Sequence, residues 1–167
     1  MEKMEVRKRY LDGIREALIS FYRENLLALV IFGSAARGDF EKGSDLDLLV
    51  ILRECENSMG KRIDEFMKIE WELRKTPEYE RVKAQGLPRR VEAVILSLKE
   101  FQSHPPLLLD LTTDAEILTD KEGVFSKELD LLRCRLKDLG ARKVILGKGR
   151  WYWILKPDIK WGENVIL

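Results

Sequence analysis

The sequence predicts an α/β (α+β) fold, with a small mixed β-sheet flanked by helices and a C-terminal extension of one helix and a β-hairpin. Three observations predict it. Short apolar runs of strand length recur before residue 100, and segments with apolar residues at helical spacing lie between them. Near the C-terminal end, a glycine-containing turn separates two runs rich in β-branched and aromatic residues. We expect the sheet to carry acidic side chains on one side and helices on the other.

The first elements along the chain are an amphipathic helix and a buried strand. From Val6 to Arg23, apolar side chains recur three and four residues apart, which predicts a helix packed on the sheet. Leu26 to Phe32 is a continuous apolar run that stops at Gly33, as expected of a buried strand. This strand leads directly into the segment with the clearest chemical pattern.

A turn of small residues follows the first strand and predicts a phosphate site. Gly33 tolerates backbone angles that other residues avoid, and it lets a ligand approach the main chain. The Ser34 hydroxyl and nearby N–H groups can donate hydrogen bonds to phosphate oxygens. Arg37 has two open interpretations, a cationic phosphate ligand or an exposed loop arginine. Lys42, in a loop of mixed charge, is expected to face solvent.

Two aspartates at the start of the second apolar run predict a divalent-metal site. Residues 45–52 predict a strand, in which residues two apart point to the same side, so Asp45 and Asp47 share one face. Hard divalent cations prefer oxygen ligands, and a bound cation offsets the repulsion between close carboxylates. The alternative is a polar strand edge with two solvated aspartates. The metal site is favoured because an acidic pair leading a run of Leu, Val and Ile needs such compensation.

A second helix and a polar stretch follow. Apolar residues at helical spacing predict a helix over residues 58–75, with its methionines and aromatic residues in the core. Thr76-Pro77 is expected to end this helix, and residues 78–90 are expected to form a polar loop. The basic residues of that loop are interpreted as solvated, and contact with a polyanionic acceptor is the alternative. They are Arg81, Lys83, Arg89 and Arg90.

A third strand supplies one more acid. Residues 89–96 are rich in β-branched residues and predict a strand in which Glu92 stands alone among apolar neighbours. Glu92 is therefore a candidate third metal ligand. The alternative is a strand-edge glutamate that pairs with Arg89 or Arg90.

The rest of the chain predicts an extension packed on a core of residues 1–104. In residues 105–167, a short helix is expected at 107–111 and a short strand at 115–118. Ser126 is expected to cap a helix that runs to about Leu139 and stops at Gly140.

A β-hairpin is predicted over residues 142–155, with Trp151 and Trp153 on one face. Its aromatic residues lie beside several basic ones, and stacking on a nucleic-acid base is one interpretation. Packing on the preceding helix is the favoured one. The basic residues are Lys143, Lys148, Arg150 and Lys156.

The spacing of the two central motifs resembles the signature of the polymerase β-type nucleotidyltransferase superfamily. Gly33-Ser34 is followed, after ten residues, by Asp45-Leu46-Asp47-Leu48. The segment from Gly33 to Val50 is most similar to the minimal nucleotidyltransferases (MNT, antitoxin-type), which often show Gly-Ser-x-Ala-Arg-Gly. The order of helices and strands is also similar through about Leu98. Many family members carry aspartate where this chain has Glu92.

The resemblance implies the nucleotidyltransferase fold and a reaction. A hydroxyl would attack the α-phosphate of a nucleoside triphosphate, most directly ATP, and release pyrophosphate. The metal ligands would be Asp45, Asp47 and Glu92, holding two Mg²⁺ ions or Mn²⁺. The nucleotide would be held by Gly33-Ser34 and by Arg37. The resemblance also implies a HEPN-type protein partner in trans, with the nucleotidyltransferase as antitoxin.

Two further functions stay open beside nucleotidyl transfer. Because Glu92 replaces the usual aspartate, the chain is alternatively a nucleotide-binding or antitoxin-type interaction module with weak catalysis. An aminoglycoside-type or RNA-directed transferase is less favoured. The first needs a helical antibiotic-binding domain for which the chain is short, and the second needs a clearer basic groove.

Composition bounds the remaining possibilities. The chain has 167 residues, enough to bury a core, and a formal net charge of +1, which gives no whole-protein basic field for nucleic acid. The two cysteines, Cys55 and Cys134, form no paired motif, and the first residues are charged where a secretory signal is apolar. A reducing cytoplasm is therefore expected. No apolar run approaches the roughly 20 residues needed to cross a bilayer, so membrane insertion is not expected.

Overall fold

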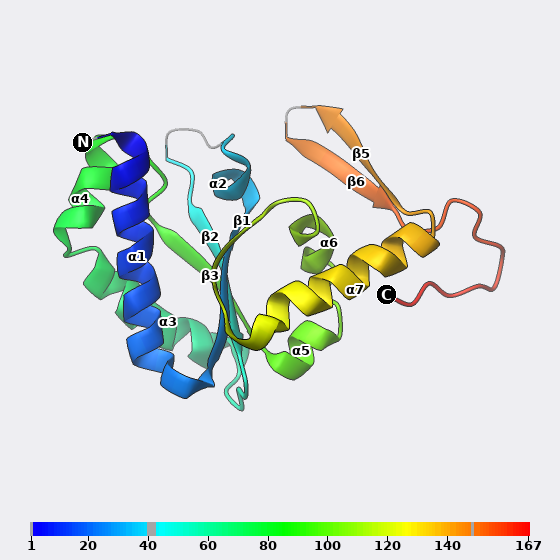
Figure 1. The fold of residues 1–167 in the computed structure, drawn as a ribbon, viewed down its shortest axis with the longest axis horizontal. Helices are drawn as coiled ribbons and strands as arrows, with labels where there is room; N and C mark the ends of the chain where they lie inside the picture. Colours follow the sequence, from blue (N-terminus) through cyan, green and yellow to red (C-terminus); the bar gives the residue numbers. More distant parts are fainter. Residues whose placement is uncertain (1, 40–42, 148) are drawn as a thin grey trace.

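A four-stranded sheet lies between two layers of helices, with a separate hairpin beside them (Figure 1). The structure is a computed structural model and describes residues 2–39, 43–147 and 149–167. Its main elements are α1 (Lys3–Tyr22), β1 (Leu26–Phe32), α2 (Gly33–Arg37), β2 (Leu46–Leu52), α3 (Met59–Leu73), α4 (Pro77–Ala84), β3 (Val91–Ser97), α5 (Leu98–Gln102), α6 (Leu107–Leu111), β4 (Ala115–Asp120), α7 (Val124–Asp138), β5 (Arg142–Gly147) and β6 (Arg150–Ile154).

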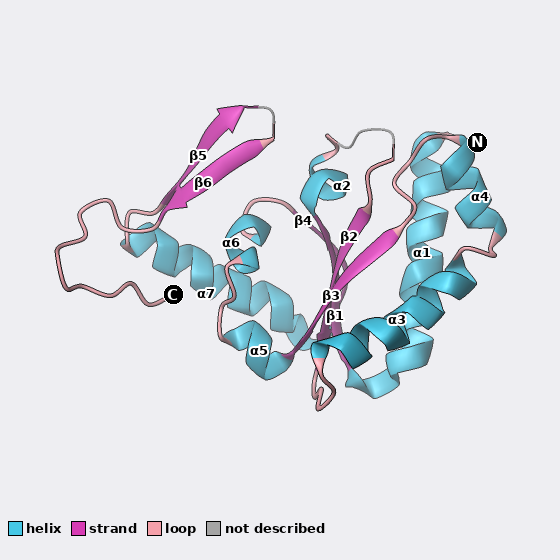
Figure 2. Cartoon of the chain, turned by 180° about the vertical axis from the view of Figure 1, so that it is seen from behind, coloured by secondary structure: helices cyan, strands magenta, loops and turns pink. Residues whose placement is uncertain are grey.

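The main sheet is mixed and has the strand order β3-β2-β1-β4. β1 runs antiparallel to β2 and β4, and β2 runs parallel to β3. Helices α1, α3 and α4 cover one face and α5, α6 and α7 cover the other (Figures 1 and 2). The predicted class, a small mixed sheet flanked by helices, is confirmed, but the helices are not confined to one side. Because β1 ends where β2 and β3 begin, the segments of the predicted site meet at one end of the sheet.

Hydrophobic burial explains why β1 and β2 are the central strands. Residues 26–31 of β1 and residues 48–52 of β2 are all buried. One cluster of buried side chains joins these strands to α1, α3 and α4, and a second joins them to α5, α6 and α7. Each fully buried Val, Leu or Ile side chain contributes about 1.5–3 kcal/mol. Apolar packing therefore fixes these strands, independently of the charged groups at their ends.

The second core cluster crosses the boundary expected at residue 104. Phe101 stacks on Phe125, with ring centroids 5.9 Å apart. β4 extends the main sheet beyond β1 and includes the strand predicted at 115–118. The short helix predicted at 107–111 is also present, as α6. The predicted hairpin forms a second sheet of two strands, β5 and β6.

Helix α4 is the largest departure from the sequence prediction. The polar loop expected over residues 78–90 is wrong for its first half, which is helical to Ala84. Thr76-Pro77 starts this helix. The Thr76 hydroxyl accepts a hydrogen bond from the Tyr79 N–H at 3.3 Å, and Pro77 stands at the first helical position, where its missing N–H costs nothing.

The start of α7 is also different, because Ser126 is not its cap. The helix begins at Val124, and Ser126 lies in its first turn. The capping group is the carboxylate of Asp120, which accepts from the Phe125 N–H at 2.9 Å and the Ser126 N–H at 3.0 Å. Gly140, with φ +68°, follows the helix as predicted.

Helix α3 does not bury all of its predicted core residues. Phe66 is buried as expected, but the other large apolar side chains form a row on the outer surface of the helix. Each is between 44% and 60% exposed, so the prediction of core packing is wrong for them. This apolar row consists of Met59, Ile63, Met67 and Trp71.

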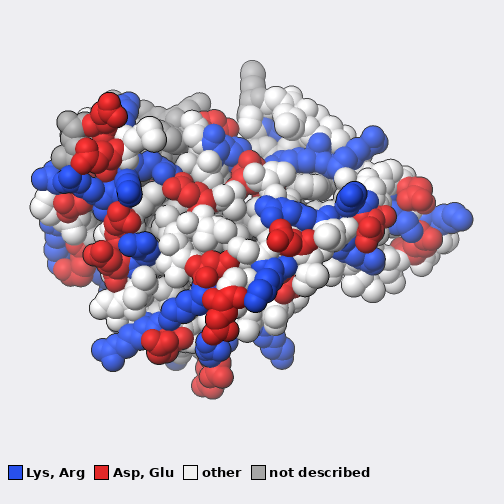
Figure 3. Space-filling model, in the orientation of Figure 1, with Lys and Arg blue, Asp and Glu red and all other residues white. Residues whose placement is uncertain are grey.

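The surface carries both signs of charge. Figure 3 shows basic and acidic side chains interspersed over the face that it presents. Within the described part of the chain, no helix is both long enough and apolar enough to cross a membrane. The expectations for Lys42 and Lys148 concern residues outside the described ranges.

Candidate active site

The three predicted acids lie at one end of the main sheet, on neighbouring strands. Asp47 is on β2, and its register partner on the parallel strand β3 is Glu92. Asp45 comes directly before β2, where the Leu46 N–H donates to the Arg90 carbonyl at 2.8 Å. Asp45 and Asp47 are partly buried, and Glu92 is exposed. The structure therefore brings together the acids that the sequence singles out.

Gly33 places the turn after β1 against the Asp47 carboxylate. Phe32, the last residue of β1, pairs with Asp47, and Gly33 follows with φ +67°. A Cβ built on Gly33 would lie 2.4 Å from Asp47 Oδ2, closer than real Cβ atoms come to another heavy atom. A side chain at Gly33 would displace the carboxylate and would also strain the left-handed backbone. Glycine is thus required for this close approach.

Ser34 and Arg37 lie on α2, a single helical turn that begins at Gly33. Gly38 ends the turn with φ +77°, and its N–H donates to the Ser34 carbonyl at 3.0 Å. Arg37 Nε donates to Asp39 Oδ2 at 3.1 Å. Burial and the neighbouring carboxylates raise the pKa of Asp47, and the charge of Arg37 offsets part of this rise, so the guanidinium lies within electrostatic reach of the acids.

The C-terminal hairpin reaches α2 through Trp151. The Arg37 guanidinium carbon lies 5.0 Å from the centre of the Trp151 ring, and Lys143 Nζ lies 4.4 Å from the same centre. Arg37 Nη1 also lies 4.0 Å from Asp114 Oδ2. A cation over an indole ring is stabilised by about 0.5–2 kcal/mol. Arg37 is therefore held against the hairpin and the loop before β4.

One aspartate of α6 anchors the hairpin. Trp151 Nε1 and Trp153 Nε1 donate to Asp110 Oδ1 at 2.6 Å and 3.0 Å, so the two indoles share one face as predicted. Lys143 Nζ donates to Asp114 Oδ2 at 3.1 Å and lies 3.4 Å from Asp110 Oδ1. This face of the hairpin contacts α6 and α2. The sequence favours packing on the preceding helix, α7, which within the described residues shares with Trp153 only the second core cluster.

Arg90 lies between two of the acids. Its Nε is 3.3 Å from Asp45 Oδ1, and a terminal nitrogen pairs with Glu92. The pairing considered as the alternative for Glu92 is therefore present. Within the described ranges, no group of three or more His, Cys, Asp or Glu side chains is already arranged to hold a metal ion.

The electrostatics of Asp47 nevertheless fit a cation. Burial raises the pKa of Asp47, and the nearby carboxylates of Glu92 and Asp45 raise it further. A raised pKa means that the ionised carboxylate costs free energy in the fold as it stands. Carboxylate oxygens are also the ligands that hard divalent cations prefer. The donor set at this end of the sheet thus fits such a cation by its chemistry.

Two cavities adjoin the acids. One, of about 440 Å³, lies between α3 and β3 and is lined by Glu70, Arg90 and Glu92 among others. The second, of about 250 Å³, lies beside Asp45, and Arg74 lines both. These cavities lie on the β3 side of Asp45, and none of the α2 residues lines them.

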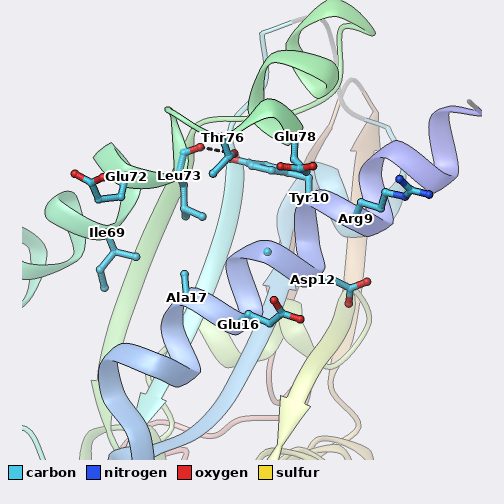
Figure 4. A pocket seen from close by; sticks show the side chains of 11 residues that line it. Arg9, Tyr10, Asp12, Glu16, Ala17, Ile69, Glu72, Leu73, Thr76 and Glu78 are labelled. Carbon is cyan, nitrogen blue, oxygen red and sulfur yellow. Dashed lines mark hydrogen bonds between the residues drawn. The ribbon is translucent and has the colours of Figure 1, made fainter.

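A third cavity lies away from the acids. It has a volume of about 510 Å³ between α1 and the connection from α3 to α4, and none of the three acids lines it (Figure 4). Tyr10 extends into it from α1, next to Thr76 and Glu78. The Tyr10 hydroxyl donates to the Arg89 carbonyl at 2.5 Å, and burial raises the pKa of Tyr10. This tyrosine therefore connects the third cavity to the segment just before β3, the strand that carries Glu92.

Sequence reasoning missed Arg74 and the contact between Arg37 and Trp151. The spacing of Glu70 and Arg74, four residues apart on one helix, is a signal that identifies Arg74 as a fixed side chain. No local signal joins residues 37 and 151, because their contact depends on how the hairpin packs on the core.

This end of the sheet combines a Gly-Ser turn with a group of carboxylates, groups whose chemistry suits phosphate oxygens and hard cations. The chain belongs to the nucleotidyltransferase domain family, whose profile matches residues 11–152. The match includes all three acids, α2 and Trp151. The resemblance drawn from the Gly-Ser and Asp-x-Asp motifs is confirmed.

Solved structures with a similar fold include members of toxin–antitoxin complexes. One is a toxin–antitoxin complex with AMP-PNP, at 16% identity over 78% of this chain and 92% of that chain, with a TM-score of 0.43. Another is a candidate nucleotidyltransferase from Sulfolobus solfataricus, at 19% over 73% and 90%, with a TM-score of 0.40. A third is the tri-AMPylated Shewanella oneidensis HEPN toxin with its MNT antitoxin, at 15% over 80% and 92%, with a TM-score of 0.41. At such low sequence identities and TM-scores, the likeness concerns the fold alone.

Proposed function

We propose that this protein transfers a nucleoside monophosphate, most directly AMP from ATP, to a hydroxyl of an acceptor and releases pyrophosphate. The observation that carries the proposal is the close approach of Gly33 to the Asp47 carboxylate, since it joins a phosphate-binding turn to the acids. Membership of the nucleotidyltransferase family supports nucleotidyl transfer in general. The choice of AMP follows the resemblance of residues 33–50 to the minimal nucleotidyltransferases.

The reaction makes one bond and breaks one. The acceptor oxygen bonds to the α-phosphorus while the bond from that phosphorus to the oxygen shared with the β-phosphorus breaks, and this oxygen leaves with pyrophosphate. Ser34 and Arg37 orient the β- and γ-phosphate oxygens from α2. Glu92, which lies on β3 at the opposite side of Asp47, takes the proton of the acceptor hydroxyl or orients the water that takes it.

The residues that would hold Mg²⁺, as two ions, or Mn²⁺ are Asp45, Asp47 and Glu92. When bound, such ions neutralise charge on the phosphates and lower the pKa of an attacking hydroxyl. The chain supplies carboxylates whose proximity raises the pKa of Asp47, and Arg90 offsets part of their repulsion by its contacts with Asp45 and Glu92.

The partner that we propose is a HEPN-type protein in trans, with this chain as antitoxin. The apolar row on α3 supports a protein partner, because contiguous exposed apolar side chains are characteristic of interaction surfaces. Nucleic acid is not favoured as partner, given the balanced charge. The location that we propose is a reducing cytoplasm, where free cysteines such as Cys55 and Cys134 persist.

A second candidate function is a nucleotide-binding or antitoxin-type interaction module of the same fold with weak catalysis. The observation that favours it is the pair of contacts from Arg90 to Asp45 and Glu92. An arginine in this position competes with a cation for the same oxygens. This candidate predicts nucleotide affinity without pyrophosphate release.

The deciding experiment is incubation with Mg²⁺ and each α-labelled nucleoside triphosphate, with and without cell lysate. Pyrophosphate release and transfer of label to protein, RNA or small molecules are measured. Label from ATP on an acceptor supports the transferase and identifies the acceptor class. The binding module would be favoured if the protein binds nucleotide but shows neither label transfer nor pyrophosphate release, in lysate and with candidate partners.

A matched control uses the double variant Asp45→Asn, Asp47→Asn, which removes the charges and keeps the side-chain shapes. Transfer should disappear in this variant while the thermal unfolding transition stays cooperative. Retained transfer in the double variant would contradict the assigned roles.

A further inference from the structure

We propose that the 250 Å³ cavity beside Asp45 binds a phosphate group of the acceptor. The proposal rests on the proposed function and narrows the acceptor to compounds that carry a phosphate near the reacting hydroxyl. The cavity lies where β2 and β3 begin, and Asp45 lines it. Its basic lining residues are Arg74, Arg89 and Arg90.

The charge of the lining fits an anion. Three arginines face one carboxylate, that of Asp45, around the cavity. Arg89 makes no side-chain ion pair with any of the residues that the structure describes, so its charge is not balanced there. Guanidinium groups present a planar fork of donors that matches phosphate oxygens in pairs. A phosphate is therefore a better match to this cavity than a neutral hydroxyl group.

Arg74 is held in place by a buried carboxylate. Glu70 on α3 is 1% exposed, and Arg74 Nε lies 2.8 Å from its Oε1 and 2.7 Å from its Oε2. A carboxylate at this depth is costly unless it is paired. The contact with Glu70 raises the pKa of Arg74, so the guanidinium stays charged. Glu70 thus fixes the orientation of an arginine that lines the cavity.

The backbone of Arg89 and the ring of Tyr79 also contact the core. The buried Tyr10 donates its hydroxyl to the Arg89 carbonyl at 2.5 Å. The Tyr10 ring also meets the Tyr79 ring edge to face, with centroids 6.2 Å apart, and Tyr79 lines the cavity. Two sides of the cavity are therefore attached to one buried residue of α1, which is what a preorganised binding site requires.

The position of the cavity points to the acceptor and not to the nucleotide. Gly33, Ser34 and Arg37 lie on the β1 side of Asp47 and do not line it. Arg90 connects the cavity to Glu92, on the side from which the acceptor hydroxyl is proposed to arrive.

The other basic residues of this part of the chain do not belong to the cavity. Arg81 Nη1 donates to Glu78 Oε1 at 3.2 Å, and Lys83 Nζ donates to Glu80 Oε1 at 3.2 Å, both along the exposed side of α4. Neither lines the cavity. Of the four basic side chains in residues 78–90, Arg81 and Lys83 are thus paired on the surface. The other two, Arg89 and Arg90, line the cavity together with Arg74. Arg81 provides a matched control for Arg89.

The test measures binding of inorganic phosphate by isothermal titration calorimetry in low salt with Mg²⁺. The titration is done with and without saturating α,β-methylene ATP, which binds as ATP but cannot transfer AMP. We expect phosphate to bind in both conditions. In Arg89→Gln its affinity should fall about tenfold, the usual weight of one charge-assisted hydrogen bond, and in Arg81→Gln it should not change.

Each other outcome overturns the proposal. Displacement of phosphate by α,β-methylene ATP would assign the arginines to the phosphates of the nucleotide. Equal affinity in the wild type and Arg89→Gln, in proteins with the same thermal unfolding midpoint, would exclude the cavity as the binding place. Absence of phosphate binding in the wild type would do the same. Binding of the ATP analogue itself, recorded in the same samples, reports separately on the proposed function.

Discussion

The strands that carry the acids and the hairpin that contacts Arg37 are held in place by different physical means. β1 and β2 are buried almost throughout, whereas no residue of β5 or β6 is fully buried. The hairpin is attached to the core by directional polar contacts, in which two indole N–H groups and one lysine meet Asp110 and Asp114. We therefore expect substitutions that remove the charge of an acid to leave the strands in place. A substitution that removes one polar contact of the hairpin should change how the hairpin packs on the core.

The largest expected effect is the loss of transfer in Asp47→Asn. Asparagine keeps the shape of the side chain but removes the charge that we propose binds the metal, so the rate should fall about a thousandfold or more. The strands should stay in place, because apolar packing on both faces of the sheet fixes them. Pyrophosphate release with ATP and the identified acceptor measures the rate, and circular dichroism checks the fold. An unfolded Asp47→Asn protein would break the comparison between strands and hairpin.

The second effect concerns the hairpin and the affinity for ATP. Arg37→Gln should weaken ATP binding about thirtyfold, through the loss of the charge-assisted contact that we propose it makes with phosphate. Trp151→Leu should weaken ATP binding about tenfold, because it removes the indole ring whose centre lies 5.0 Å from the Arg37 guanidinium carbon. In the double variant the two losses should not add, because both act through one guanidinium. Affinity is measured by calorimetry with Mg²⁺ and α,β-methylene ATP.

Two control variants test whether Trp151 affects ATP affinity by orienting Arg37. Trp161→Leu removes an exposed indole outside the hairpin and should leave ATP affinity unchanged. Trp151→Phe keeps an aromatic face but loses the hydrogen bond to Asp110, so it should recover part of the affinity lost in Trp151→Leu. Strictly additive losses for Arg37 and Trp151 would show that the hairpin does not act through Arg37.

The same comparison explains how much of the molecule the sequence predicts. Apolar runs, a glycine stop and alternate acids are local patterns, so the strands at 26–32 and 46–52 and the proximity of Asp45 and Asp47 follow from them. Helix α4 also has a local signal, because Thr76-Pro77 is typical of a helix start, whereas the prediction over residues 58–75 uses this pair only as a helix end.

Other features have no local signal. The cap of α7 comes from Asp120, six residues before Ser126, and depends on the end of a strand. The approach of Trp151 to Arg37 joins segments more than a hundred residues apart and depends on packing through Asp110. The exposed row on α3 has the same spacing as a buried stripe, so periodicity does not distinguish them.

A smaller effect is expected at Ser34. Ser34→Ala removes the hydroxyl that we propose donates to the phosphates, so it should weaken ATP binding about three- to fivefold. The fold should not change, because Gly33 and the acids keep their contacts. Binding of AMP, which lacks the β- and γ-phosphates, should be unaffected in the same calorimetric assay. Equal losses for ATP and AMP would place Ser34 elsewhere in the site.

The smallest effect is a gain in stability in Asp47→Asn without metal. The folded pKa of Asp47 is raised above its unfolded value, so its contribution to stability is present below the unfolded pKa, about 3.9, and is lost as pH rises through the folded pKa. Asparagine is neutral at every pH and does not suffer this loss. In EDTA at pH 7 the variant should unfold about 1–3 °C higher than the wild type, a small shift because solvent screens the partly exposed carboxylate. The difference should vanish near pH 3 in the same calorimetric scans.

In the hairpin, Asp110→Asn should lower the unfolding midpoint instead, because that carboxylate accepts from two indoles and lies beside Lys143. A lower midpoint for Asp47→Asn at pH 7 would mean that the charge of Asp47 supports the fold, and the contrast between the two regions would not hold.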